Sequence, residues 1–313
     1  MKKGILFLVI GILTLGIVVC SYLFFIRRSA TKKTIQAKIV RIGYFPNITH
    51  AQAIIGLSQG TFQKYLGKNI RIETKVFNAG PSEIEALFAG SIDIGYIGPG
   101  PAINGYVKSS GQEVRIVSGS ALGGASLVVQ PDIAAAFASI GPQALQGKKI
   151  ASPQQGNTQD LSLRHYLSIE GLKKTTTIIP VANADQVPLF QKKEIDGAWA
   201  PEPWATILTT EAGGKRIIDE RDLWKDNAFS TTVVIVRKKF LQENPQIVRS
   251  WLTAQAEITK WITDHPEEAR LTVNKELEKL TSKQIPTNVL DDAWNRLSFS
   301  TDPAMSSIAS LVI

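Results

Sequence analysis

Cysteine and histidine are scarce in this sequence. Its 313 residues include one cysteine, Cys20, and three histidines, His50, His165 and His265. A single cysteine cannot form a disulfide bond within the chain and cannot supply a multi-cysteine zinc site. Because the histidines are widely separated, a histidine-rich metal centre is not expected either. We therefore predict that the protein has no metal site.

Motifs of familiar enzymes are also missing. The sequence has no G-x-S-x-G, no Walker loop, no H-E-x-x-H and no G-x-G-x-x-G. The glycine-rich segment 98–101 has no lysine or threonine at the spacing of a phosphate-binding loop. These absences predict a protein that is not an enzyme, with no catalytic residues and no cofactor.

Acidic residues are absent from the N-terminal segment, and this explains most of the net charge. The whole chain has 35 Lys plus Arg against 27 Asp plus Glu, a formal charge of +8. Residues 1–33 contain six of these bases and no acid, so the other 280 residues have a formal charge of only +2. A nucleic-acid-binding domain needs a basic face. We therefore predict no interaction with nucleic acid.

Charged residues of either sign are absent from Gly4 to Ile26, a run of 23 residues. As a helix it would span about 34 Å, enough to cross a hydrocarbon core of about 30 Å. A cleavable signal peptide has a shorter apolar stretch of roughly 7–15 residues. We predict that residues 1–33 are an uncleaved signal anchor with a linker, which tethers an extracytoplasmic protein to the membrane. Lipidation at Cys20 is the alternative, although Val19 stands where lipoproteins have a small residue.

The rest of the chain contains short apolar runs that alternate with helical patterns. Such alternation is typical of parallel sheets covered on both faces. The pattern restarts after residues 146–147, which predicts two lobes. The predicted strands are 38–44, 70–77, 92–96, 114–120, 126–130, 149–152, 176–181, 195–198 and 231–236. The predicted helices are 51–66, 81–88, 101–108, 158–170 and 184–192, and the chain is predicted to be mostly helical from residue 238.

A short pattern occurs once in each series. Residues 85–88 (EALF) lead through a turn to 92–99 (IDIGYIGP), and residues 187–190 (VPLF) lead to 195–201 (IDGAWAP). Aligned on Leu-Phe and Ile-Asp, the two copies differ by one residue in the turn. Chance similarity is the alternative. If the repeat is real, each lobe has an equivalent loop at the carboxyl end of a strand, where open α/β sheets bind ligands.

Loops of small and polar residues precede three of the predicted helices. They are 47–50 (NITH), 78–82 (NAGPS) and 155–160 (QGNTQD). The first turn of a helix has unpaired N–H groups and the positive end of the helix dipole, so it can bind an anion. Simple capping of the helix by Asn or Thr is the alternative for each loop. Large rings that could form the wall of a pocket occur beside these loops and in the loop 199–204: Tyr44, Phe45, Tyr96, Trp199 and Trp204. Packing in the core is the alternative for these rings, more for Tyr96 than for Trp204.

The segments 41–50 (RIGYFPNITH), 77–100, 156–160 (GNTQD) and 200–204 (APEPW) resemble the nitrate/sulfonate/taurine family of ABC-transporter substrate-binding proteins. The resemblance extends over about residues 38–300. It implies an α/β type II periplasmic-binding-protein fold, with a mixed sheet flanked by helices in each lobe and the ligand in the cleft between the lobes. Lobe one would be 38–123 plus 229–313, and lobe two would be 124–228.

The resemblance also implies four ligand-binding segments and a wall formed by the loop 199–204. The residues themselves add His50, which follows the Phe-Pro-Asn loop, and Glu202, which could accept a hydrogen bond from a solute or hold a neighbouring loop. The predicted ligand-binding residues are Phe45, Pro46, Asn47, His50, Gly80, Pro81, Ser82, Ile97, Gly98, Pro99, Asn157, Thr158, Gln159, Glu202 and Trp204.

Together these observations predict a monomeric binding protein of an ABC importer. Its ligand would be a small anionic solute, an aliphatic sulfonate, and its partners would be the permease subunits with their ATPase. A receptor for nitrate, taurine or a pyrimidine remains an alternative. An enzyme that makes a pyrimidine precursor is a weaker one, because it would need a reactive histidine and a lysine for a pyridoxal cofactor in a cytosolic chain.

Overall fold

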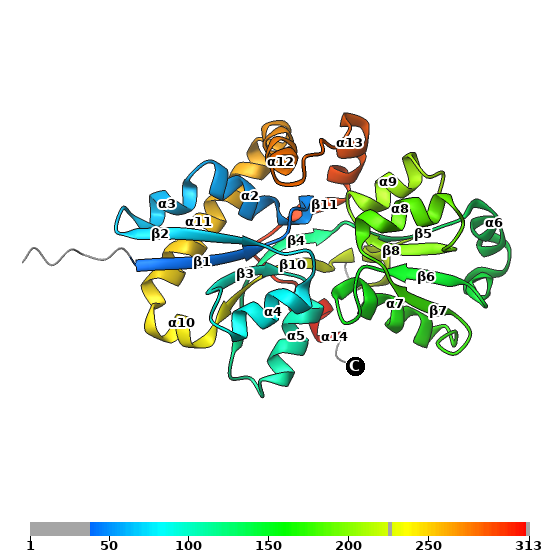
Figure 1. Cartoon of the computed structure of the whole chain (residues 1–313), viewed down its shortest axis with the longest axis horizontal. Helices are drawn as coiled ribbons and strands as arrows, with labels where there is room; N and C mark the ends of the chain where they lie inside the picture. Colours follow the sequence, from blue (N-terminus) through cyan, green and yellow to red (C-terminus); the bar gives the residue numbers. More distant parts are fainter. Residues whose placement is uncertain (1–37, 225–226, 311–313) are drawn as a thin grey trace, which may run out of the picture. The chain divides into compact units, whose positions relative to one another are not determined.

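The computed structural model describes residues 38–224 and 227–310. From Ile39 onward the chain forms one compact unit that contains two β-sheets, each flanked by helices (Figure 1). The larger sheet has the order β11 (Leu297–Phe299), β4 (Val114–Gly123), β10 (Ser230–Arg237), β3 (Ile94–Ile97), β1 (Lys38–Tyr44), β2 (Ile70–Val76). The smaller sheet has the order β7 (Thr177–Pro180), β6 (Lys149–Ser152), β8 (Gly197–Pro201), β5 (Ala125–Val129), β9 (Lys215–Asp219).

The helices include all those predicted before residue 238, together with two α-helices that were not predicted, Pro131–Ile140 and Trp204–Thr210. Up to β10 they are η1 (Ile48–His50), α2 (Ala51–Ser58), α3 (Thr61–Leu66), α4 (Gly80–Phe88), α5 (Pro99–Lys108), α6 (Pro131–Ile140), η2 (Gly141–Leu145), α7 (Thr158–Ile169), α8 (Asn183–Gln191), α9 (Trp204–Thr210) and η3 (Glu220–Leu223). After β10 they are α10 (Lys238–Glu243), α11 (Pro245–Asp264), α12 (Pro266–Thr281), α13 (Thr287–Asn295) and α14 (Met305–Ser310). The single helix predicted over 51–66 is two helices, because Gly60 between them has a φ of +71°.

Both sheets are mixed, as the resemblance implied, so the parallel pairing that the strand–helix alternation indicated holds for only part of each sheet. β1 is parallel to β3, and β6 is parallel to β7 and β8. In contrast, β10 is antiparallel to β3 and β4, and β5 is antiparallel to β8 and β9. Each of these exceptions is a strand that enters its sheet from a distant part of the chain or directly from the other sheet. Local strand–helix alternation therefore could not predict its direction.

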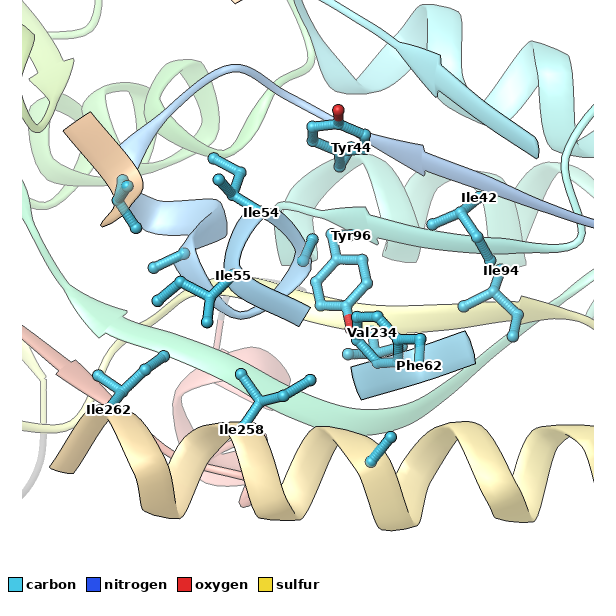
Figure 2. Packing of buried hydrophobic residues seen from close by; sticks show 14 of the residues in the cluster. Ile42, Tyr44, Ile54, Ile55, Phe62, Ile94, Tyr96, Val234, Ile258 and Ile262 are labelled. Carbon is cyan, nitrogen blue, oxygen red and sulfur yellow. The ribbon is translucent and has the colours of Figure 1, made fainter. Parts of the chain in front are cut away.

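The central strands of each sheet are buried on both faces, which explains their continuous apolar runs. In β10, Val234 packs with Phe62 of α3 and Ile258 of α11 (Figure 2), whereas the neighbouring Val233 and Ile235 belong to a cluster with residues of α4 and α5. In the larger sheet's core, the rings of Phe62 and Trp251 stack at a centroid distance of 3.6 Å.

The smaller sheet is covered in the same way. Leu127 and Val129 of β5 pack with residues of α6 and α7, and Val128 between them packs with residues of α8 and α9. β4 ends at Gly123 and β5 begins at Ala125, so the chain passes from the larger sheet to the smaller one across Gly124. It returns to the larger sheet at β10. The exact lobe boundaries stay a prediction.

The repeated sequence pattern corresponds to two units with the same local structure. Asp93 exchanges backbone and side-chain hydrogen bonds with Arg41 of β1: its N–H donates to the Arg41 carbonyl (2.8 Å) and its carboxylate accepts from the Arg41 N–H (3.0 Å). Asp196 makes the same two bonds with Lys149 of β6, at 2.9 and 2.7 Å. The aspartate therefore joins each unit to the neighbouring parallel strand.

The two units align without the predicted one-residue difference in the turn. α4 and α8 have nine residues each, and both begin 12 residues before the isoleucine that precedes the aspartate. Their turns each contain a residue with positive φ at the same place, Gly90 and Lys193. Buried Leu87 therefore corresponds to buried Phe190, while Phe88 is more than one-third exposed. Matching the two Leu-Phe pairs was wrong because burial, not residue identity, is what repeats.

The predicted membrane anchor at residues 1–33 lies outside the described residues. Within the part of the chain that the structure describes, we find no helix that combines the length and the apolar character needed to span a bilayer.

Candidate functional site

A small polar cavity lies where strands of both sheets end. Its volume is about 40 Å³, a few times the minimum that one water molecule needs. The lining residues come from the loops after β1, β2, β3, β6 and β7, from the end of β8 and from the beginning of β10: Phe45, Asn47, Thr49, His50, Asn78, Ala79, Gly80, Gly98, Pro101, Pro153, Asn157, Thr158, Gln159, Asn183, Pro201 and Thr231. We call it the polar pocket. Its position is the one where α/β sheets generally bind ligands.

Eight of the residues predicted to bind ligand line the polar pocket. They are Phe45, Asn47, His50, Gly80, Gly98, Asn157, Thr158 and Gln159. Pro46 and Trp204 line a separate cavity of about 610 Å³, and Ser82 lines one of about 390 Å³ that shares four residues with the polar pocket. Pro81, Ile97, Pro99 and Glu202 line none of these three cavities. Ligand contact by any of these residues stays a prediction.

Sequence reasoning did not single out the other eight lining residues for ligand contact. Asn78 and Ala79 lie in a helix-start loop that it did identify. Asn183 occupies in α8 the position that Gly80 occupies in α4, so a gapless alignment of the two repeated units would have found it. Pro153 and Thr231 reach the pocket only through tertiary packing, and no local sequence signal marks them.

Five helices of eight or more residues contribute their first residues or the preceding loop to the polar pocket: α2, α4, α5, α7 and α8. They differ in how these ends are capped, and the N-cap residue of α2, His50, makes no side-chain cap. The Asn157 side chain accepts from the Asp160 N–H (2.8 Å) and so caps α7. No side chain of the N-cap residue caps α4, α5 or α8. Asn157 therefore caps its helix, and ligand contact by the same residue stays a prediction. In α8 the Asp185 N–H donates to the Ala182 carbonyl (2.9 Å), so a backbone group rather than a side chain accepts from its first turn.

His50 is the only titratable residue among the lining residues. It is 2% exposed, and burial lowers its pKa to about 3, so the ring is neutral at physiological pH. Its Nδ1 accepts a hydrogen bond from the Phe45 N–H (3.3 Å). We therefore assign the ring proton to Nε2, which makes His50 a neutral donor.

The pocket therefore offers neutral hydrogen-bonding groups and no charged side chain. Backbone N–H groups, amides and hydroxyl groups surround the cavity, and no Lys, Arg, Asp or Glu lines it. His50 Nδ1 accepts from the Phe45 N–H, so this nitrogen is not available as a base for a hydroxyl group. In the described ranges, no group of three or more His, Cys, Asp or Glu residues is placed to hold a metal ion.

Glu202 holds the loop between β8 and α9. It is fully buried, and its carboxylate accepts from Arg216 Nη2 (2.6 Å) and from the Thr206 N–H (3.0 Å). Burial raises the pKa of Glu202, and the positive charge of Arg216 opposes that rise. Of the two roles considered for this residue, holding a neighbouring loop is the one that these contacts fill. The loop follows Pro201, the last residue of β8, which lines the polar pocket, and leads to Trp204.

Asp160 fixes the loop before α7 to the smaller sheet. Its carboxylate accepts from Ser152 Oγ (3.0 Å), the Gly156 N–H (2.9 Å) and Arg164 Nε (2.8 Å). Because these donors belong to β6, the loop and α7, elements of the smaller sheet's half hold Asn157, Thr158 and Gln159 in position.

The chain is similar to known binding proteins. Residues 33–275 match the model of the NMT1-like family. A putative binding protein of Brucella abortus is 30% identical over 234 residues, which cover 74% of this chain and 69% of that protein. A putative aliphatic sulfonates-binding protein of Bacillus subtilis is 24% identical, over 86% of this chain and 76% of its own.

Solved structures of binding proteins share the fold. The periplasmic aliphatic sulphonate binding protein SsuA from Escherichia coli superimposes with a TM-score of 0.70 at 22% sequence identity, over 88% of this chain and 89% of that one. The likeness confirms the predicted α/β fold of two mixed sheets flanked by helices. The chain belongs to the NMT1-like family, and the comparisons confirm its resemblance to the nitrate/sulfonate/taurine group of ABC-transporter substrate-binding proteins.

Proposed function

We propose that this protein is the extracytoplasmic receptor of an ABC importer and that it captures a small anionic solute, an aliphatic sulfonate. One observation carries the proposal: helix starts from both sheets meet at a buried pocket lined by neutral donors. Such groups stabilise an anion through N–H hydrogen bonds and helix dipoles. The sulfonate names of the Bacillus relative and of the E. coli structure support this choice of anion.

The cavity sizes support a solute with a small head and a longer body. The polar pocket of about 40 Å³ has room for a compact group only. The cavity of about 390 Å³ shares Asn78, Ala79, Pro153 and Asn183 with it, and the apolar cavity of about 610 Å³ begins at Pro46, next to Phe45 and Asn47. In this proposal the sulfonate occupies the polar pocket and the alkyl chain extends into the adjoining space.

The proposal also includes two lobes that close on the solute. Donors from α4 belong to the larger sheet's half and donors from α7 and α8 to the smaller sheet's half. A solute that binds both halves therefore favours the arrangement in which they are close together. Release to the permease would follow when the lobes separate. The tether through residues 1–33 and the monomeric state are part of this proposal.

A solute panel tests the proposal with the full-length protein in detergent. Methanesulfonate, longer alkanesulfonates, taurine, nitrate and a pyrimidine are compared by thermal shift, and each solute is recovered for chemical analysis. A bound solute at about 100 times its Kd adds about 2.7 kcal/mol to the free energy of unfolding. We expect stabilisation by alkanesulfonates and their recovery unchanged. Stabilisation by the pyrimidine alone, or conversion of any solute, would contradict the proposal.

A pair of variants then tests the location. Asn183 lies in the first turn of α8 and lines the polar pocket, and in this proposal its side-chain amide N–H donates to the sulfonate. We expect Asn183→Ala to lower sulfonate affinity about ten-fold, the order expected for one lost hydrogen bond to a charged group. Gln146→Ala is the matched control, because Gln146 is exposed and lies outside the cavities described above. Equal affinities of the two folded variants would move the site elsewhere.

A further inference from the structure

One hydrogen bond joins the two halves of the molecule beside the polar pocket. The backbone N–H of Gly100, in the first turn of α5, donates to Oγ1 of Thr158, the first residue of α7 (3.2 Å). Both groups are buried, and Thr158 is 2% exposed. A second bond nearby runs from Asn104 Nδ2 of α5 to the Gly156 carbonyl (3.3 Å). The start of α5 therefore contacts the start of α7 directly.

The first turn of α5 has no side-chain hydrogen-bond acceptor from its own N-cap residue. Its first three residues are Pro99, Gly100 and Pro101, and proline has no N–H, so Gly100 carries the only N–H among them. The N-cap residue Gly98 has no side chain that could accept from it. In most helices the N-cap side chain fills this role. Here the oxygen comes from Thr158, 58 residues away along the chain and on the other sheet's half.

Two glycines at the start of α5, Gly98 and Gly100, allow Thr158 to lie close to this helix. A β-carbon on Gly98 would overlap Thr158 Oγ1, and one on Gly100 would lie 3.0 Å from Thr158 Cα and 3.1 Å from Thr158 N. The second contact is with backbone, which cannot rotate away as a side chain can. Gly98 has a φ of −67°, so its backbone conformation does not require glycine. Close approach to Thr158 is the constraint that the structure places on it.

Thr158 is held in position independently of any solute. The Asp160 carboxylate fixes the loop before α7 through Ser152, Gly156 and Arg164, and Asn157 caps the helix. The Thr158 hydroxyl group accepts from Gly100 and still has its own hydrogen to donate. One side chain can therefore bind the opposite half of the molecule and a solute at the same time.

We propose that Thr158 is the N-cap of α5 across the cleft and that this contact populates the closed arrangement before solute binds. The inference rests on the proposed function in one respect, the two lobes that open and close. In the open arrangement, the Gly100 N–H would be left to water. The solute then binds a protein that is already partly closed, and its apparent affinity depends on that closed fraction.

The test measures closure without solute. Full-length protein in detergent, with Cys20→Ser, is labelled at Leu271→Cys of α12 and Ile140→Cys of α6. Both positions are more than 60% exposed. Spin-label distance distributions then give the ratio of closed to open molecules. For Thr158→Val, which keeps the shape and removes the acceptor, we expect that ratio to fall about 2- to 30-fold, the range for losing a helix N-cap. Thr158→Ser is the matched control and should keep the ratio within about two-fold of wild type.

A double substitution adds a second, independent readout. Gly98→Ala should lower the closed fraction in wild type, because its β-carbon would overlap Thr158 Oγ1. In a Thr158→Ala background the overlapping atom is gone, so Gly98→Ala should have little further effect. Additive effects would contradict the proposed contact.

Three results would overturn the inference. They are an entirely open wild type without solute, the same distance distribution for Thr158→Val and wild type, and a Thr158→Ser protein as open as Thr158→Val. If Thr158 only touches solute, Thr158→Val lowers solute affinity while the solute-free distances stay unchanged. Because these distances are read without solute, a failed solute panel would contradict the proposed function and leave this measurement valid.

Discussion

Glu220 shows how one buried residue can make stability depend on pH. It is fully buried, and its carboxylate accepts from Trp199 Nε1 (3.1 Å) through one oxygen, while the other oxygen has no hydrogen-bond partner. Burial raises the pKa of Glu220 from its ordinary value of 4.5 to about 7. The folded protein therefore holds this proton at pH values where the unfolded chain has lost it.

The raised pKa predicts lower stability at alkaline pH. Because the folded-state pKa lies above the unfolded one, the contribution of Glu220 is fully present below pH 4.5 and is lost as pH rises through 7. The loss by pH 8 is about 3 kcal/mol, from a shift of roughly two and a half units. Glu220→Gln should melt higher than wild type at pH 8 and close to wild type at pH 5. Equal melting temperatures at pH 8 would contradict this assignment.

Glu83 of α4 is a second buried carboxyl group, and its surroundings are apolar. Neither carboxyl oxygen has a hydrogen-bond partner, and the space it fills exists because Gly43 and Gly95, paired on β1 and β3, have no side chains. Burial raises the pKa of Glu83 well above its ordinary value. We expect Glu83→Met, of similar volume, to increase the free energy of unfolding by about 1–3 kcal/mol in denaturant titrations at pH 7. Gly43→Ala, whose β-carbon would overlap this carboxyl group, should instead be destabilising.

His50 predicts how solute affinity depends on pH. Since burial lowers its pKa to about 3, the ring stays neutral throughout the range from pH 5 to 8. No other lining residue of the polar pocket titrates in that range. The Kd for an alkanesulfonate, measured by calorimetry, should therefore be the same within about two-fold at pH 5, 6.5 and 8. A ten-fold tighter Kd at pH 5 would show that a cationic histidine holds the anion.

At the scale of elements, the start of α7 has two roles, helix capping and pocket lining, which substitutions at Asn157 can separate. Asn157 lines the polar pocket, and its side chain also caps the helix by accepting from the Asp160 N–H. Asn157→Ala should therefore lower the free energy of unfolding by about 0.5–2 kcal/mol as well as weaken solute binding. Asn157→Ser keeps a capping oxygen and should lose only a few tenths of a kcal/mol. Chemical denaturation of the two variants checks this difference, and equal losses would argue against the cap.

At the scale of the whole molecule, Trp204 lies in the cavity of about 610 Å³ rather than in the polar pocket. Ile207 of α9 lies beside it on one wall, and Leu277 and Ile285 belong to the opposite half. If the alkyl chain of a solute extends into this cavity, each added CH₂ contributes about 0.8 kcal/mol, or about four-fold in affinity. Trp204→Ala should weaken hexanesulfonate binding and leave methanesulfonate binding unchanged in calorimetry. Equal losses for both solutes would place Trp204 at the anion instead.

The sequence by itself determined much of this protein's local structure. Alternating apolar runs predicted most strands and helices in order but missed α6, α9 and β9. The loops 47–50, 78–82 and 155–160 predicted three helix starts that line the polar pocket, and the motifs predicted the family. These features depend on burial periodicity and on hydrogen bonds between near neighbours in the chain. Local sequence is enough to encode them.

Only the tertiary structure determined the contacts between segments that are distant in the sequence. The direction of β10 and β5, the ion pair of Glu202 with Arg216, and the bond from Gly100 to Thr158 all depend on which distant segments pack side by side. A carboxylate or a hydroxyl group can satisfy its hydrogen bonds with a solute or with the protein, and local sequence does not distinguish these partners. Burial settles the choice, because a buried polar group must find its partner among whatever groups the fold places beside it.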